Sequence, residues 1–241
     1  MSKLHANVLA AAERRGDARV RIGLAAVLVI FAVAVVMLIV GGRDTASEAA
    51  VVPTAVTETG AIRAVAPEVE LEAGTDSPRR VVTIYEDYQC PACKNFEATF
   101  GGTLDELRTT GTAAIDYHPI AFLDRMSTTG YSSRAANASV CVAESAIDSW
   151  RGFHSAAYAQ QPPEGGQGLS DDQLSEIAVA AGAPESVSEC ISSGRYNDWV
   201  ESSTHTILGT DVNSTPTVLL NGTLLDLTTP EALSAAVLAI R

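Results

Sequence analysis

Basic side chains are scarce in this chain of 241 residues. It has 16 Lys and Arg, only two of them Lys, against 29 Asp and Glu, so its net charge at pH 7 is −13. Residues 1–21 alone carry five of the basic residues. Proteins bind nucleic acids and anionic lipid surfaces through Lys and Arg, so we expect no nucleic-acid partner for the rest of the chain. Hydrophobic residues still make up 46% of the sequence, which is enough for a packed core.

Cysteine is also rare, and its spacing excludes two common uses. The four cysteines are Cys90, Cys93, Cys141 and Cys190, and only the first two lie close together. A zinc site would need a second close pair or a neighbouring histidine. Haem attachment needs a histidine directly after the second cysteine, where this chain has Lys94. We therefore expect no metal, and no cofactor other than a redox-active disulfide.

A hydrolase site is not indicated either. The chain has no Gly-x-Ser-x-Gly motif, and His118, His154 and His205 are scattered along it. We interpret these histidines as packing or surface residues.

One long apolar run lies near the N-terminus. Residues 22–42 lie between Arg21 and Arg43 and carry no charge. As a helix, residues 22–40 would be about 28 Å long, close to the hydrocarbon thickness of a bilayer. A cleavable signal peptide has a shorter apolar region of about 7–15 residues, so we predict an uncleaved transmembrane signal-anchor helix at 22–42.

The charges around this run predict its orientation. Four arginines precede it and one follows, so residues 1–21 are predicted to be a cytoplasmic tail. The rest would then lie outside the cytoplasm, as part of a single-pass protein of the cell membrane. We interpret residues 43–78 as an extracytoplasmic linker that ends in a short strand near 62–65.

The hydrophobic pattern after residue 78 predicts two strand-rich segments around a helical block. Strand, helix and strand are expected at 81–85, 94–107 and 113–122. Five helices are expected at 131–146, 150–160, 171–181, 185–193 and 196–208. A hairpin and a last helix capped by Thr229 complete the chain, with strands at 217–220 and 223–227. We expect an α/β domain from 79–125 and 210–241, with 126–209 as an inserted helical domain.

Cys90 and Cys93 lie where the first strand leads into its helix. One helical turn brings the two side chains together, and Pro91 suits the first helical position. Cys90 would then cap the helix, where unpaired backbone N–H groups favour a thiolate and lower the pKa. A disulfide formed by such an exposed thiolate exchanges easily. It would stabilise the fold little, because it closes a short loop.

Cys141 and Cys190 are predicted on separate helices of the inserted block, 49 positions apart. Four cysteines allow three pairings, and these two lack the exposed turn of the first pair. We expect them to form a structural disulfide that stabilises the fold by about 4 kcal/mol in the chain-entropy model.

These features resemble the DsbA-like branch of the thioredoxin fold. The features shared with this branch are the strand–Cys-x-x-Cys–helix unit, a Thr-Pro step before a later strand and the helical block between them. All of them lie within residues 79–241. The motif residues are Cys90-Pro91-Ala92-Cys93 and Thr215-Pro216. The resemblance implies a thioredoxin-like βαβ…ββα fold with an inserted helical domain, here preceded by the transmembrane helix. It also implies that the Thr-Pro step is cis and lines a groove for extended substrate peptides.

The resemblance further implies a reaction. A substrate thiolate attacks the Cys90–Cys93 disulfide, a mixed disulfide forms at Cys90, and a second substrate thiolate releases it, with Cys93 as the resolving partner. The substrates would be reduced exported proteins. A membrane quinone-linked enzyme, DsbB-like or vitamin K epoxide reductase-like, would reoxidise the pair. Isomerases of this class carry a dimerisation region, which residues 43–78 do not resemble, so we expect a monomeric oxidase.

Two positions depart from the family pattern. The strongest oxidants carry His before the second cysteine, whereas Ala92 offers the thiolate no hydrogen bond, so we expect a less oxidising pair. Many members place an acid six residues before the first cysteine, where this chain has Ile84. Glu86 shares a strand face with that position and could accept a proton, but we interpret it as a solvated loop carboxylate.

Two other functions stay open. The same fold could act as a disulfide reductase or isomerase, or it could be a binding or chaperone-like module with an inert disulfide. Reactivity separates the last from the others, because a catalytic Cys90 alkylates rapidly once reduced and a structural one does not.

Overall fold

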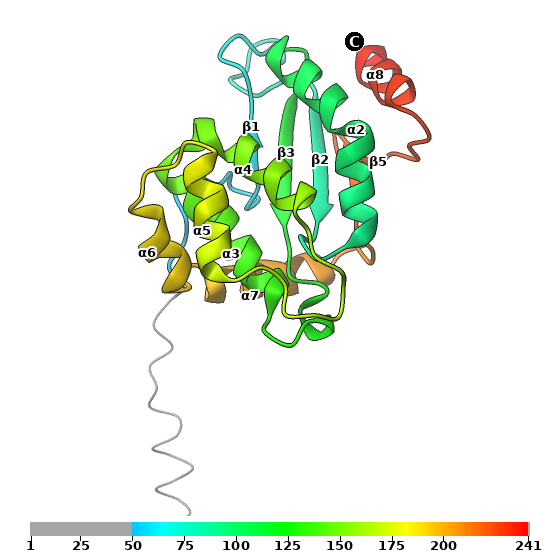
Figure 1. The fold of residues 1–241 in the computed structure, drawn as a ribbon. Helices are drawn as coiled ribbons and strands as arrows, with labels where there is room; N and C mark the ends of the chain where they lie inside the picture. Colours follow the sequence, from blue (N-terminus) through cyan, green and yellow to red (C-terminus); the bar gives the residue numbers. More distant parts are fainter. Residues whose placement is uncertain (1–49, 241) are drawn as a thin grey trace, which may run out of the picture. The chain divides into compact units, whose positions relative to one another are not determined.

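A five-stranded mixed sheet organises residues 50–240, the part of the chain that the computed structural model describes (Figure 1). The strand order is β1-β3-β2-β4-β5, with β2 and β3 parallel and all other neighbours antiparallel. The strands are β1 Ile62–Ala64, β2 Val81–Glu86, β3 Ala114–Pro119, β4 Thr217–Leu220 and β5 Thr223–Leu224. This mixed sheet confirms the predicted α/β fold with a helical insertion.

Two helices belong to the sheet domain, and the others form the insertion. Helix α2 (Pro91–Thr109) connects β2 to β3, and α8 (Pro230–Ala239) ends the chain and packs against α2 (Figure 1). The insertion lies between β3 and β4. It consists of η1 Asp124–Met126, α3 Tyr131–Ser145, α4 Ile147–Ala159, α5 Asp171–Ala180, α6 Val187–Ser192 and α7 Asn197–Leu208.

Local sequence signals predicted most of the helix and strand boundaries closely. Ser170 and Gln173 form a capping box at α5, and Thr229 caps α8 with Pro230 in the first helical position. Asn221 and Gly222 both have positive φ, as a tight hairpin turn requires. The predicted strand 223–227 was too long, because only its first two residues pair with β4.

One hydrophobic core joins the sheet to the insertion. Ile84 of β2, Leu104 of α2 and Phe153 of α4 are fully buried members of the same cluster. Helix α2 contributes a stripe at helical spacing that includes Phe96 and Phe100, whose rings stack. The inserted helices therefore share their core with the redox helix.

The predicted linker at 43–78 is wrong for residues 50–78. Ala50–Arg241 form one compact unit, and β1 pairs antiparallel with β3 through this segment. Ala61 and Ile62 are fully buried, and Glu144 of α3 accepts hydrogen bonds from the backbone of Thr54. The segment folds because its few apolar side chains cover an otherwise open sheet edge. The short strand expected within it is confirmed.

The predicted membrane anchor and cytoplasmic tail lie in the part of the chain before the described residues. Residues 1–21 and 22–42 lie outside the described residues, as does the start of the predicted linker. Within residues 50–240, no helix combines the length and the apolar character needed to cross a bilayer.

Candidate functional site

Cys90 lies at the N-terminus of α2, directly after the turn that follows β2. It is the N-cap of the helix, with Pro91 in the first turn, as predicted. The Cys93 backbone N–H donates to Cys90 Sγ over 3.4 Å, and the Cys90 thiol donates to the Thr215 carbonyl oxygen, also over 3.4 Å. The pair is in the dithiol form. Ala92 is exposed on the first helical turn.

The two thiols differ strongly in acidity. A hydrogen bond from the Cys93 thiol is the main cause that lowers the pKa of Cys90 to about 6, and Thr215 and the backbone of the first turn add to it. Burial and the nearby Cys90 sulfur raise the pKa of Cys93 well above its usual value. Negative charge therefore resides at Cys90 and the proton at Cys93, near neutral pH.

Cys90 is less exposed than predicted. Only 5% of its surface is accessible, and Cys93 is fully buried. The sulfur of Cys90 sits in the edge of the hydrophobic core, close to the loop before β4.

The predicted Thr215-Pro216 step lies beside the redox pair. The peptide bond between the two residues is cis, and β4 begins at the next residue. Strand β4 pairs with β2, and Cys90 follows the turn after β2. The fold therefore brings Cys90 and Thr215, which are 125 residues apart, into contact. The sequence predicted both members of this juxtaposition.

Cys141 and Cys190 form the predicted disulfide. The Cα atoms are 5.8 Å apart, and the bond joins α3 to α6 within the insertion. This bond is separate from the redox pair, so its role is structural.

Glu86 is not the solvated carboxylate that the sequence analysis expected. It is fully buried, because β2 alternates and Glu86 continues the core-facing series of Val82 and Ile84. Helix α4 of the insertion covers it. His154 Nδ1 lies 3.3 Å from Glu86 Oε1, and His154 Nε2 lies 3.2 Å from Glu97 Oε1.

This buried cluster consists of two carboxylates and a histidine, and one oxygen or ring nitrogen of each lies within 4.8 Å of the other two. The two carboxylates contact opposite nitrogens of the His154 ring. Arg151 supplies positive charge, with its Nη2 3.0 Å from Glu97 Oε2. Burial and the neighbouring Glu97 raise the pKa of Glu86, which favours its protonated form.

Two residues that sequence reasoning missed, Asp87 and Gln161, hold the turn before Cys90. Asp87 accepts hydrogen bonds from Gln89, Leu123 and Ser132. Gln161 at the end of α4 donates to the carbonyl oxygens of Tyr88 and Cys90, at 2.8 and 2.9 Å. An Asp two residues before Gln89 is typical of an Asx turn, so the sequence contained a signal for Asp87. It contained no signal for the residues of the insertion that hold this turn.

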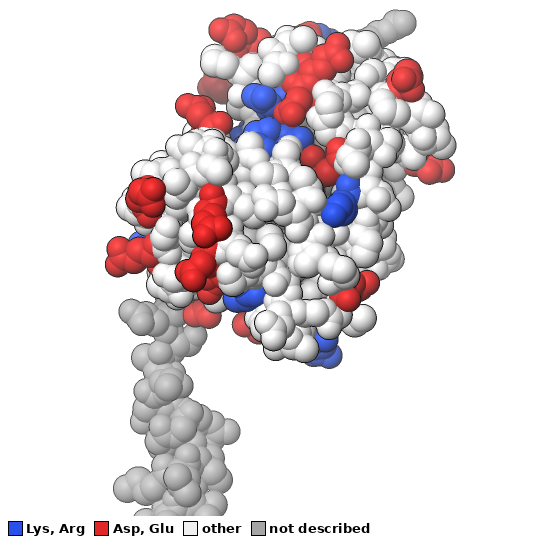
Figure 2. Space-filling view, in the orientation of Figure 1, with Lys and Arg blue, Asp and Glu red and all other residues white. Residues whose placement is uncertain are grey.

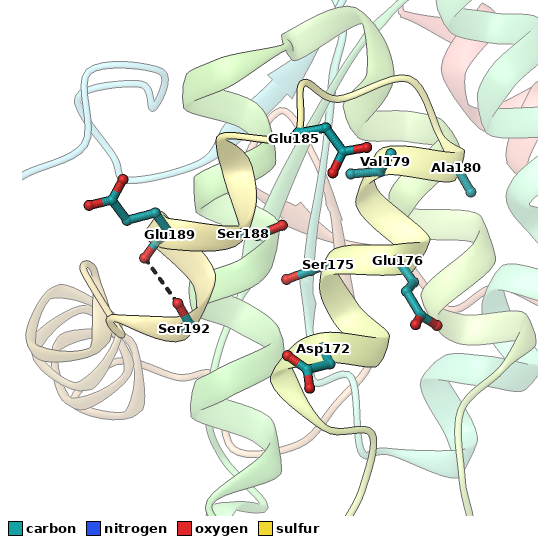
Figure 3. Close-up of a pocket in the computed structure, with 9 residues that line it drawn as sticks. All are labelled: Asp172, Ser175, Glu176, Val179, Ala180, Glu185, Ser188, Glu189 and Ser192. Carbon is teal, nitrogen blue, oxygen red and sulfur yellow. Dashed lines mark hydrogen bonds between the residues drawn. The ribbon is translucent and has the colours of Figure 1, made fainter.

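A groove of about 700 Å³ lies elsewhere, between α5 and α6 (Figure 3). It contains none of the predicted site residues, and acidic side chains from both helices line it, namely Asp172, Glu176, Glu185 and Glu189. Acidic residues are also spread over the face seen in Figure 2, in keeping with the net charge. We assign no function to this groove.

Comparison with known proteins agrees with the site. The family model described as "Thioredoxin" matches residues 68–239. Oxidised DsbA of Mycobacterium tuberculosis is 40% identical with a TM-score of 0.70, over 75% of this chain and 92% of that one. The reduced disulfide bond oxidoreductase DsbG of the same organism is also 40% identical with a TM-score of 0.70, over 75% and 86%.

A curated relative shares part of the sequence. The serine/threonine-protein kinase PknE of M. tuberculosis is 30% identical over 126 residues, which are 50% of this chain but only 22% of the kinase. The match therefore concerns a fraction of that protein. With the family model covering most of the chain and the disulfide oxidoreductases matching it in sequence and fold, the chain belongs to the thioredoxin family, in its DsbA-like branch, and is a protein disulfide oxidoreductase.

Proposed function

We propose that this protein donates the Cys90–Cys93 disulfide to reduced exported proteins. The observation that carries the proposal is the contrast between the two sulfurs. Cys90 holds a stabilised thiolate beside the Thr215-Pro216 loop, whereas Cys93 is buried and protonated. A stabilised thiolate favours the reduced pair, and a disulfide whose reduced form is stabilised is a good oxidant.

The reaction proceeds by two exchanges. A substrate thiolate attacks Cys90 Sγ, the bond to Cys93 breaks, and Cys93 leaves with the electron pair and takes up a proton. A second substrate thiolate then attacks the substrate sulfur of the mixed disulfide, and Cys90 leaves as a thiolate. The substrate loses two electrons and gains a disulfide, while the pair becomes a dithiol. The Cys90–Cys93 pair is the only redox group that this scheme requires.

The loop at Thr215-Pro216 would hold the substrate. Cys90 Sγ lies 3.4 Å from the Thr215 carbonyl oxygen, so an incoming peptide would reach the sulfur alongside this loop. An extended segment could pair there with free backbone groups. Ala92 adds no side-chain hydrogen bond to the thiolate, so the pair should be a weaker oxidant than family members with His at this position.

The membrane anchor completes the proposal. The apolar run at 22–42 would hold the catalytic unit, as a monomer, on the outer side of the cell membrane. A quinone-linked membrane enzyme of the DsbB or vitamin K epoxide reductase-like type would then reoxidise the pair. The acidic catalytic unit gives no support for a nucleic-acid partner.

An equilibrium redox titration tests the direction of the reaction. The full-length protein in detergent is equilibrated with glutathione buffers, and the Cys90–Cys93 pair is followed by mass after alkylation, with Cys90→Ser as the control. A potential between about −120 and −200 mV supports disulfide donation. A pair that does not titrate would refute it and favour the inert binding module.

A reductase is the second candidate. The feature that favours it is Ala92, which provides none of the thiolate stabilisation of a His at the same position. A potential near −270 mV, as in thioredoxin, would decide for this function. A disulfide isomerase would instead rearrange scrambled substrates without net oxidation.

A further inference from the structure

Asp87 is a buried carboxylate three residues before Cys90 that the reaction scheme above does not use. It is fully inaccessible to solvent, at the end of β2. All three of its side-chain partners are neutral donors. Asp87 Oδ1 accepts from the Gln89 backbone N–H at 2.8 Å and from the Ser132 hydroxyl at 2.7 Å, and Oδ2 accepts from the Leu123 backbone N–H at 2.8 Å.

These partners belong to three segments that meet at the redox site. Gln89 is in the turn that carries Cys90, Leu123 is in the loop after β3, and Ser132 is in the first turn of α3. The turn is also tied from its other end, because the Gln89 side chain donates to the Leu123 carbonyl oxygen at 2.6 Å. The Cys90 backbone N–H donates to the Asp87 carbonyl oxygen at 2.9 Å. Asp87 thus fixes the position of Cys90 relative to the insertion.

The charge of Asp87 also acts on Cys90. Burial raises the pKa of Asp87 to about 6, its hydrogen bonds oppose that rise, and repulsion from the Cys90 thiolate adds to it. The repulsion is mutual, so an ionised Asp87 makes the thiolate less stable than the helix N-terminus alone would. Glu86, Tyr131 and Tyr158 also feel the Asp87 charge.

We propose that Asp87 is a positioning residue of the redox site, which fixes the Cys90 turn against the insertion and sets an upper limit to the stability of the Cys90 thiolate by its negative charge. The inference rests on the proposed role of Cys90 as the attacked sulfur. It goes beyond that role because it assigns to a residue outside the Cys-x-x-Cys motif an effect that opposes the stabilisation of the Cys90 thiolate by the helix N-terminus.

Asp87→Asn removes the charge and keeps most of the anchoring. Asparagine keeps the oxygen that accepts from Gln89 and Ser132 but loses the hydrogen bond from the Leu123 N–H, because its second polar group is a donor. Ser132→Ala keeps the charge and removes one hydrogen bond. Asp124→Asn is the matched control, because Asp124 accepts from the Ser133 N–H and hydroxyl in the same region without binding the Cys90 turn.

The pH dependence of Cys90 alkylation and the redox equilibrium with glutathione are measured on the reduced full-length protein and each variant. We expect Asp87→Asn to raise the acid dissociation constant of Cys90, read from the alkylation profile, and to shift the glutathione equilibrium at pH 7, where Asp87 is mostly ionised, toward the dithiol, each by about three- to tenfold. Ser132→Ala and Asp124→Asn should change both by less than about twofold.

Equal values for Asp87→Asn and wild type would overturn the proposal, as would an equal rise in Asp124→Asn. A shift in Ser132→Ala as large as in Asp87→Asn would show that anchoring, not charge, controls the thiolate. A wild-type Cys90 that titrates near pH 9 would count against the proposed function instead, and the comparison of Asp87→Asn with wild type would still decide the role of Asp87.

Discussion

At the scale of single residues, Cys90 and Cys93 have the same side chain but different roles, because they occupy different positions in the helix. Cys90 ends an extended segment, so its sulfur faces the unpaired N–H groups of the first helical turn. Cys93 lies one turn inside the helix, in the core, where charge is costly. The donor that contributes most to the low pKa of Cys90 is the Cys93 thiol, so the two groups titrate as a pair.

Cys93→Ala should raise the pKa of Cys90 above about 6, because the thiol that donates to the thiolate is lost. We expect alkylation of Cys90 at pH 6 to slow by about tenfold. The rate of iodoacetamide labelling from pH 4 to 9 measures this. Cys93→Ser, which keeps a donor, should lie between the two, and an unchanged profile in Cys93→Ala would contradict the role given to Cys93.

Glu86 should make stability depend on pH. Its pKa is raised by burial in the folded state, so its contribution to stability is fully present below the unfolded pKa of about 4.3 and is lost as the pH rises toward the folded pKa. Glu86→Gln should therefore gain stability relative to wild type as the pH rises from 4 to 7.

Urea unfolding of the oxidised protein at pH 4 and at pH 7 measures this gain in the free energy of unfolding. Glu106→Gln, on the exposed face of the same helix as Glu97, is the control and should show no such difference. A Glu86→Gln variant that is less stable than wild type at pH 7 by as much as at pH 4 would argue against a protonated Glu86.

At the scale of elements, the strongly patterned segments were predictable and the others were not. The helices α3, α5 and α7 follow helical spacing with clear caps or breaks, so their bounds came out within about two residues. Residues 50–64 carry a weak pattern, and β1 exists because β3 offers it a free edge with Tyr117 opposite Ile62. An edge strand of three residues is stabilised by its partner, which a local pattern does not contain.

Ile62→Ala tests whether this segment is part of the fold. Ile62 is fully buried, so truncation should destabilise the protein by about 2–4 kcal/mol. Val52→Ala is the control, since Val52 is 67% exposed and should change stability by less than about 0.5 kcal/mol. Chemical denaturation measures both, and a neutral Ile62→Ala would restore the interpretation of residues 50–78 as a linker.

The Cys141–Cys190 disulfide should stabilise the insertion without controlling the redox pair. Replacing both cysteines by Ala should lower the free energy of unfolding by about 4 kcal/mol in the chain-entropy model. The glutathione equilibrium of Cys90–Cys93 should stay within about twofold of wild type. Unfolding in urea and the redox titration check the two statements, and a large change in the potential would mean that the bonds are coupled.

At the scale of the whole molecule, the insertion is a working part of the redox site. Its helix α4 covers Glu86, Gln161 holds the turn before Cys90, and Ser132 of α3 binds Asp87. The core that runs from the sheet into α4 makes the two parts one body. Changes in the insertion should therefore reach the redox pair through these contacts.

The predicted membrane anchor would determine where the whole molecule is located. The full-length protein expressed in bacteria should sediment with membranes and resist extraction by alkaline carbonate, because a span of 21 uncharged residues buries enough apolar surface to hold it. Added protease should digest the catalytic unit in spheroplasts. The chain from residue 43 onward, exported behind a cleavable signal, is the control and should be soluble. A full-length protein found in the soluble fraction would refute the anchor.

The sequence by itself determined the redox motif, the cap at Cys90, the fold class and the position of the Thr215-Pro216 step, because each depends on residues near one another or on a pattern along one element. The cis state of that step was expected only from the family resemblance, and the structure shows it. Tertiary structure alone decided the burial of Glu86, its pairing with His154, the role of Gln161 and the partners of Asp87. Those depend on which inserted helix covers the end of β2. The choice is made by packing of segments that are 36 or more residues apart, as for Asp87 with Leu123 and Ser132, and no local pattern predicts it.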